Sequence, residues 1–218
     1  MSSATVRGAW REGRRQSARA AIVDAAWEAV REQGLAGLSM RDLATRAGIT
    51  TPTVYAYFAS KNEIYDAMFG QAAADFASRM AAPYPEGTPL ENLVAGARRF
   101  VEFCTEDVAR YQLLFQRTIP GFEPSPGSYA HAVEALEGSR RRLAANGITE
   151  PHHLDIWTAL VTGLVDQQIS NDPGGDRWLR LIDESVEMFV SHCRQARRST
   201  SRSTARLSSS PQKKGAPR

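Results

Sequence analysis

The residues with the clearest chemistry lie in the stretch GITTPTVYAYF, residues 48–58, which offers hydroxyl and methyl groups but no charged side chain. Gly48 predicts a tight turn and Thr50 a helix N-cap, while Pro52 suits a first helical turn, where its missing N–H costs nothing. Tyrosine and threonine hydroxyls bond phosphate oxygens, and threonine or alanine methyls pack against thymine methyls. The stretch therefore favours contact with DNA.

The spacing of these residues gives the predicted helix two faces. At about 100° per residue, Val54 and Phe58 share a bearing and should face a core. Small or hydroxyl-bearing side chains occupy the rest of the helix and its cap: Thr50, Thr51, Pro52, Thr53 and Ala56. Tyr55 and Tyr57 fall on the two flanks, from which their hydroxyls could reach the walls of a groove. The alternative is that both tyrosines are only half-buried packing residues.

Positive charge is concentrated at the two ends of the chain, although the formal net charge is only +3. Residues 1–20 and 196–218 hold 12 of the 27 Lys and Arg residues and one of the 24 acids, which leaves 15 bases against 23 acids between them. Basic ends on an acidic body indicate arms for nucleic acid, although a basic tail is often only a solubiliser.

Affinity for DNA must come from outside the predicted reading helix, because that helix has no Arg, Lys, Asn or Gln for bidentate contact with a base. The candidate phosphate contacts flank it in the sequence: Arg7, Arg11, Arg14, Arg15, Arg41 and Lys61. We expect residues 1–14 to form a basic flexible arm that lies along the DNA. An arm without any fixed contact is the alternative.

Helical periodicity runs through the whole chain and no convincing strand pattern occurs, so an all-α fold is predicted. The predicted helices cover about residues 15–33, 39–48, 50–58, 60–80, 90–105, 108–116, 128–147, 151–171 and 174–194, and residues 196–218 are expected to be disordered. Cys104 and Cys193 fall in apolar helical patterns, which favours free buried thiols in a reducing cytoplasm over a disulfide scaffold. No apolar run reaches the length of a membrane span.

The segment SMRDLATRAGITTPTVYAYFASKNEIYDAMF, residues 39–69, resembles the DNA-binding domain of the TetR family of bacterial regulators. The matching features are Ala47-Gly48-Ile49, the capping Thr50, the run Val54-Tyr55-x-Tyr57-Phe58 and the pair Ser60-Lys61. The resemblance covers about residues 15–68 and implies a three-helix, helix-turn-helix DNA-binding domain. It implies that residues 51–57 meet the major groove and that Lys61 contacts phosphate. Thr51 and Ala56 depart from the pattern, since relatives often carry basic or hydrogen-bonding residues there.

The same resemblance implies that residues 69–195 form a helical domain that binds a small effector and dimerises. The expected pocket lining is mostly aromatic: Phe69, Phe76, Phe100, Phe103, Tyr111, Phe115, Phe122, His131 and Trp157. Tyr111, Gln112, Gln116 and His131 are the polar candidates, and the lining favours a hydrophobic or aromatic ligand. Ordinary core packing also explains these aromatic residues.

Two apolar faces near the C-terminus suggest a dimer interface. The first carries Trp157, Leu160, Val161, Leu164 and Gln168, and the second carries Leu179, Ile182, Val186, Phe189, Val190 and Cys193. Two such helices from each subunit would bury both faces in a bundle, and Gly163 would allow close approach. The alternative is that the faces cover only the core of their own chain.

The resemblance therefore implies a cytoplasmic, homodimeric transcription regulator that binds a palindromic operator and is released by a small hydrophobic effector, and repression instead of activation is expected on the family alone. A ligand-independent DNA-binding or architectural protein with a solidly packed C-terminal domain is the alternative. An enzyme is not expected, because no phosphate loop or nucleophile elbow occurs. No cofactor or metal is expected either, because His152 and His153 are adjacent and would diverge on a helix.

Overall fold

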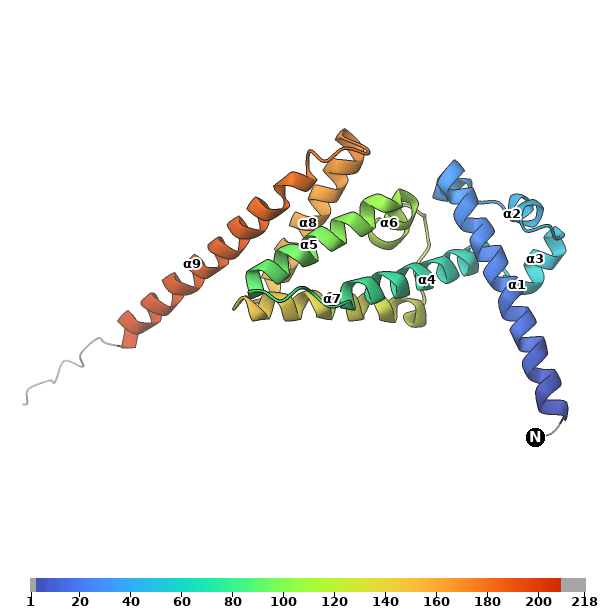
Figure 1. The fold of residues 1–218 in the computed structure, drawn as a ribbon, viewed down its shortest axis with the longest axis horizontal. Helices are drawn as coiled ribbons and strands as arrows, with labels where there is room; N and C mark the ends of the chain where they lie inside the picture. The colour runs from blue at the N-terminus through green and yellow to red at the C-terminus, as the bar shows by residue number, and fades with distance from the viewer. Residues whose placement is uncertain (1–2, 209–218) are drawn as a thin grey trace, which may run out of the picture. The chain divides into compact units, whose positions relative to one another are not determined.

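All regular structure in the described part of the chain is helical, which confirms the all-α prediction (Figure 1). The computed structural model describes the backbone of residues 3–208 and the side chains of residues 12–195. The α-helices are α1 (Ser3–Gln33), α2 (Met40–Arg46), α3 (Thr51–Tyr57), α4 (Lys61–Ala81), α5 (Pro89–Glu106), α6 (Val108–Phe115), α7 (Pro126–Ala145), α8 (Pro151–Asn171) and α9 (Ile182–Ser208). Two short 3-10 turns, η1 (Leu35–Gly37) and η2 (Leu179–Leu181), complete the set.

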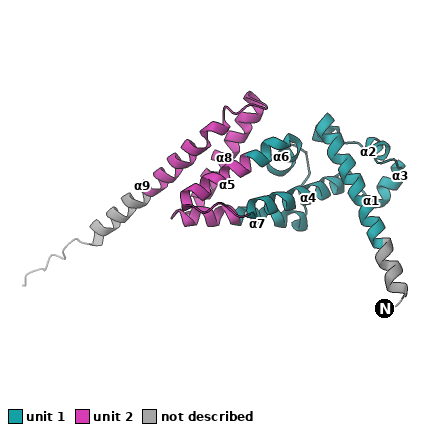
Figure 2. Cartoon of the chain, in the orientation of Figure 1, with its two compact units in different colours: residues 1–82, 102–137 teal, residues 83–101, 138–218 magenta. Residues whose placement is uncertain are grey.

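The chain forms two compact units, and the first of them includes α1 to α4 (Figure 2). The first unit contains residues 1–82 and 102–137, and the second contains residues 83–101 and 138–218. The boundary predicted at residue 68 falls inside α4, whose buried side chains Ile64, Met68 and Ala72 belong to the same core cluster as those of α1 to α3. The helix-turn-helix and the first part of the following domain therefore share one core.

Three hydroxyl side chains begin three of the helices of the first unit, as their N-cap positions predict. Ser39 accepts a hydrogen bond from the backbone N–H of Asp42 at 3.1 Å, and Ser60 accepts one from Glu63 at 3.3 Å. Thr50 caps α3 in the same way. Each cap satisfies an N–H group that a helix terminus otherwise leaves without a partner. The turn between α2 and α3 contains Gly48 at φ 65°, a backbone conformation that glycine adopts without strain.

Helices α1 and α9 are longer than the sequence analysis predicts. Helix α1 begins at Ser3, where the analysis places a flexible arm, and α9 continues to Ser208 inside the predicted disordered tail. Both extensions are rich in Ala, Arg and Ser and contain no proline, and adding a residue to an existing helix is far easier than starting one. Residues 209–218 lie outside the described part.

Helix α9 also begins later than predicted, at Ile182 instead of residue 174. The reason is a local hydrogen-bonded turn after α8, in which the Asp172 carboxylate accepts from the Arg177 N–H at 2.9 Å. The Trp178 N–H donates to Oε1 of Gln168 at 2.9 Å, so these backbone groups are satisfied outside a helix.

Polar bonds tie α4 to the elements around α1. The Tyr65 hydroxyl donates to the Leu35 carbonyl at 2.6 Å, and burial raises its pKa. The Trp27 indole N–H donates to Gln71 at 2.8 Å. Because Tyr65 and Gln71 belong to α4, these bonds fix that helix against α1 and η1.

Both cysteines are free and buried, as predicted. Within the described residues, no helix combines the length and the apolar character needed to span a bilayer.

We predict that Tyr65→Phe lowers the free energy of unfolding by about 1 kcal/mol, because the buried Leu35 carbonyl loses its hydrogen-bond donor. Urea denaturation at fixed protein concentration measures this change. Tyr129→Phe is the matched control, since the Tyr129 side chain is half-exposed, and it should shift stability by less than about 0.5 kcal/mol. Equal effects of the two substitutions would contradict the assignment.

Candidate nucleic-acid interface

Helix α3 has the two faces that its sequence predicts. Val54 and Phe58 are completely buried, each with 0% of its surface exposed. Pro52 and Ala56 are exposed on the other side, and Tyr55 is 52% exposed. Three further residues of the predicted DNA-binding set are partly exposed or exposed at the cap and flanks: Thr51, Tyr57 and Thr50. The helix therefore presents an uncharged outer surface on a fully buried base.

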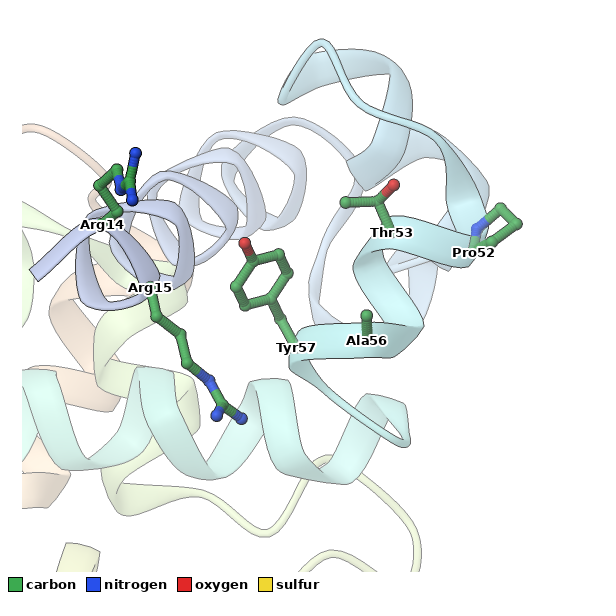
Figure 3. Close-up of a pocket in the computed structure, with 6 residues that line it drawn as sticks. All are labelled: Arg14, Arg15, Pro52, Thr53, Ala56 and Tyr57. Carbon is green, nitrogen blue, oxygen red and sulfur yellow. The ribbon is translucent and has the colours of Figure 1, made fainter. Parts of the chain in front are cut away.

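An open groove runs between the outer surface of α3 and α1 (Figure 3). Its lining is Pro52, Thr53, Ala56 and Tyr57 from α3 with Arg14 and Arg15 from α1. Two arginines predicted as phosphate contacts therefore stand beside the uncharged helix, separated from it by some 40 residues of sequence. The side chains of Arg7 and Arg11, also predicted contacts, lie outside the described residues.

Arg19 joins α1 to the end of α3, and the sequence did not predict this role. Its guanidinium donates to the Tyr57 carbonyl at 2.7 Å and lies 4.0 Å from the centroid of the Phe58 ring. The bond satisfies a carbonyl at the C-terminal end of α3, where helical carbonyls lack partners. The only sequence signal was its position one turn after Arg15 on the same helix, which gives no indication of this partner.

Arg41 and Lys61 are exposed on the first turns of α2 and α4, as a phosphate contact requires. Arg46 is different, because it is bound within the unit, at 2.6 Å to Glu32 and 2.8 Å to Asp42. The hydrogen bonds from Arg46 lower the pKa of Glu32. Arg46 therefore connects α1 to α2 instead of extending toward a ligand.

A second set of charged contacts joins α1, α4 and α6. Arg31 of α1 lies 2.8 Å from Asp107, which also caps α6 by accepting from the Arg110 N–H at 3.1 Å. The Arg110 side chain lies 3.0 Å from Asp75 of α4 and 3.8 Å from the Phe103 ring centroid. These residues link the helix that carries Arg14 and Arg15 to the helices that follow the DNA-binding segment.

A partly open cavity of about 620 Å³ lies between α4, the end of α6 and the start of α7. Four of the residues predicted for the pocket line it: Phe69, Phe115, Gln116 and Phe122. Leu113, Leu114, Ile119 and Tyr129 complete an apolar wall that the sequence analysis did not assign. The Tyr129 ring stacks on Phe69 with 6.3 Å between centroids. This volume is within the range of small-molecule sites.

The other predicted pocket residues lie elsewhere. Phe76, Phe103 and Tyr111 are buried core residues of the first unit, with the Phe76 and Phe103 rings 5.0 Å apart. Phe100 and Trp157 belong to the second unit. The His131 side chain is 48% exposed and lies 4.0 Å from Glu134. The described side chains include no group of three His, Cys, Asp or Glu residues arranged to hold a metal ion.

Most residues of the predicted dimer interface are buried within their own unit. They are Trp157, Val161, Leu164, Gln168, Ile182, Val186, Phe189 and Val190, while Leu160 is partly exposed. Trp157 and Phe189 pack together with ring centroids 5.6 Å apart, which joins α8 to α9. Among the described side chains of α8, η2 and α9, the large apolar ones that are exposed are Ile156, Leu181 and Met188.

The model of the family described as "Bacterial regulatory proteins, tetR family" matches residues 22–68. These residues include the end of α1, α2, α3 and the start of α4. Residues 22–68 therefore match the DNA-binding segment of the TetR family. The curated relatives that share this segment are HTH-type transcriptional regulators.

Individual relatives agree with this family. The chain is 27% identical over 145 residues to the HTH-type transcriptional regulator Rv1816 of Mycobacterium tuberculosis, covering 63% of this chain and 62% of that protein. It is 28% identical over 103 residues to the HTH-type transcriptional activator FasR of Mycolicibacterium smegmatis, covering 47% of each. The chain thus spans less than two thirds of the length of these curated relatives.

Solved structures share the fold. A TetR-family regulator from Streptomyces coelicolor superposes with a TM-score of 0.64 at 21% identity, covering 93% of this chain and 91% of that one. PfmR from Thermus thermophilus superposes with a TM-score of 0.59 at 18% identity, covering 78% and 97%. At these identities the likeness concerns the architecture alone.

We predict that the double variant Arg14→Gln/Arg15→Gln weakens DNA binding and flattens its salt dependence, because each lost phosphate contact removes about 0.9 from the slope of log K against log salt. Fluorescence anisotropy at several salt concentrations measures both quantities. Arg140→Gln/Arg141→Gln is the control, since it removes the same charge from α7, and its slope should equal that of the unchanged protein. An unchanged slope in the first variant would show that Arg14 and Arg15 make no such contact.

Proposed function

We propose that the protein is a homodimeric repressor whose two α3 helices enter successive major grooves of a palindromic operator. The observation that carries this proposal is the groove of α3, in which an uncharged surface stands beside Arg14 and Arg15. Arginines can bind phosphates while the small side chains of α3 approach the bases. Tyr55 and Tyr57 flank the helix, and Arg41 and Lys61 are exposed to bind further phosphates.

A two-fold symmetric operator needs a two-fold symmetric protein. We propose that the dimer forms through the exposed side of α8 and α9. On α8, Ile156, Leu160 and Gly163 follow each other at helical spacing and are exposed or partly exposed. A Cβ added at Gly163 would meet no atom within 4 Å, so a partner helix has room to approach closely. Met188 is 62% exposed on α9 and would extend this surface.

The cavity lined by Phe69, Phe122 and Tyr129 is the proposed effector site. Its apolar wall favours an apolar or aromatic ligand, with Gln116 and Arg117 as polar groups at the wall. A cavity of this size favours a ligand-responsive regulator over a protein with a solidly packed C-terminal domain.

Helix α4 would transmit the presence of the effector. Phe69 of α4 lines the cavity, and only Phe58 and Ala59 separate the end of α3 from Ser60, the N-cap of α4. Asp66 of α4 accepts hydrogen bonds from the Ser125 N–H at 2.6 Å and its hydroxyl at 2.9 Å, next to the cavity wall at Pro124 and Pro126. An effector that fits one arrangement of α4 better than another would change the separation of the two α3 helices, and operator affinity would fall.

The relative FasR is named as a transcriptional activator, so activation of transcription is the second candidate function. Selection of bound sequences from random DNA, followed by a promoter fusion to a reporter, separates the two. Repression predicts higher reporter activity when the gene for the protein is deleted, and activation predicts lower activity. Failure to select any sequence would contradict both.

We predict that Ile156→Asp and Met188→Asp each raise the dimer dissociation constant by about tenfold or more, because a buried charge without a partner opposes association. Sedimentation velocity over a range of concentrations measures this constant. Val133→Asp places the same charge on an exposed apolar position of α7 and should leave the dimer unchanged. A dimer that withstands both α8 and α9 substitutions would refute this interface.

We predict that Ile119→Trp abolishes release from the operator by an effector, because the indole fills the cavity. Operator affinity without effector should stay within about threefold, since Ile119 is remote in sequence from α3 and only partly buried. The effector would be found by screening apolar compounds for release of the selected operator. Val133→Trp, outside the cavity, should keep the response, and a response kept by Ile119→Trp would place the effector elsewhere.

A further inference from the structure

We infer that the operator is read through the 5-methyl groups of thymines, which pack against Pro52, Thr53 and Ala56. The base pairs beneath these residues are A·T pairs, with at least one thymine methyl in contact in each half-site. This inference rests on the proposed function, in which α3 enters the major groove, and it names the base chemistry that α3 selects.

The side chains at the centre of the outer face of α3 cannot read a base by hydrogen bonding. Proline and alanine carry no polar side-chain atom, and Pro52 and Ala56 are exposed. In the major groove, guanine, cytosine and adenine are distinguished by their hydrogen-bond donors and acceptors, whereas thymine also presents a methyl group. A surface of methyl and methylene groups therefore recognises thymine and gains nothing from the polar edges of the other bases.

The hydroxyl of Thr53 already has a partner. Its Oγ1 lies 2.8 Å from Oγ1 of Thr50, and Thr50 also accepts from the Thr53 N–H at 3.3 Å. The bond between the two hydroxyls orients the Thr53 side chain, and the bond from the Thr53 backbone N–H fixes Thr50 as the cap. Figure 3 shows the hydroxyl and the methyl of Thr53 on different sides of its Cβ atom, so the bonded hydroxyl leaves the methyl available.

Helix α3 cannot roll to present a different set of side chains. Val54 and Phe58 have no exposed surface, and turning the helix would bring both out of the core. Arg19 also holds the last carbonyl of α3, that of Tyr57, at 2.7 Å. The face formed by residues 52, 53 and 56 is therefore the one that meets the bases.

The polar side chains nearest to this face are placed to contact the DNA backbone, and such contacts do not distinguish one base from another. Tyr57 lines the groove from α3, and Arg14 and Arg15 line it from α1. Tyr55 is 52% exposed. Their natural partners are the phosphates on the groove walls. Readout of guanine by Arg14 or Arg15 is the competing possibility, and the experiment distinguishes it.

The test replaces single thymines of the selected operator with deoxyuridine, which keeps base pairing and removes only the methyl group. At the contacted position, the dissociation constant should rise about fourfold for each lost methyl and about fifteenfold when both half-sites are changed. Deoxyuridine outside the footprint is the control and should have no effect. Cytosine at the contacted position should bind weakly, and 5-methylcytosine should recover part of the loss.

The protein-side test is Thr53→Ser, which keeps the hydroxyl bonded to Thr50 and removes the methyl. This variant should bind the thymine operator about fourfold more weakly per half-site, and one deoxyuridine position should then cease to matter. Thr45→Ser is the matched control, because the Thr45 hydroxyl bonds the Arg41 carbonyl on α2 at 3.1 Å. Circular dichroism confirms that both variants fold.

Specific operator binding that no deoxyuridine substitution weakens would overturn the inference and leave the proposed function intact. Loss of affinity on replacing guanine with 7-deazaguanine, without any effect of deoxyuridine, would assign readout to the arginines and overturn it as well. Absence of any preferred sequence would remove the proposed function together with the inference.

Discussion

The whole DNA-binding surface depends on anchoring a helix that has no stability of its own. Helix α3 has seven residues, well below the length at which an isolated helix persists in water. Three contacts stabilise it: the Thr50 cap at its start, the buried side chains of Val54 and Phe58 beneath it, and Arg19 at its end. Because these contacts use only the inner face and the two ends, the outer face is left without structural constraints and can be chosen for DNA alone.

Because α3 is anchored in this way, we propose that different residues supply the affinity for DNA and the specificity for a base sequence. The outer face of α3 carries no charge, so in the proposed complex the attraction to DNA comes from the basic residues of α1 and of the starts of α2 and α4. A contact with phosphate is strong at low salt but indifferent to sequence, whereas a methyl contact is weak but selective. Arg46 shows that charge alone does not decide which group is available, since its two carboxylate partners occupy it within the unit.

Local signals predicted the DNA-binding segment well, because each of its features has a cause within a few residues. The caps Ser39, Thr50 and Ser60, the glycine of the turn and the buried pair Val54 and Phe58 all follow from spacing. Partners distant in sequence were not predictable in this way. Nothing near Arg19 indicates the Tyr57 carbonyl, and the length of α1 depends on elongation from a helix already packed against the core.

Periodicity was least informative for the apolar faces of α8 and α9, because it marks a buried side chain without naming what buries it. Trp157 and Phe189 pack against each other within one chain. Ile156 and Met188 are exposed, and they lie outside the apolar periodicity that marks the buried faces of α8 and α9. The cavity beside α4 shows the same ambiguity. Aromatic residues such as Phe76 and Phe103 fill the core, and the cavity lies where the proline-rich segment 118–127 interrupts helical packing beside α4. A segment that cannot continue a helix leaves space beside α4, the helix that we propose to transmit the presence of an effector to α3.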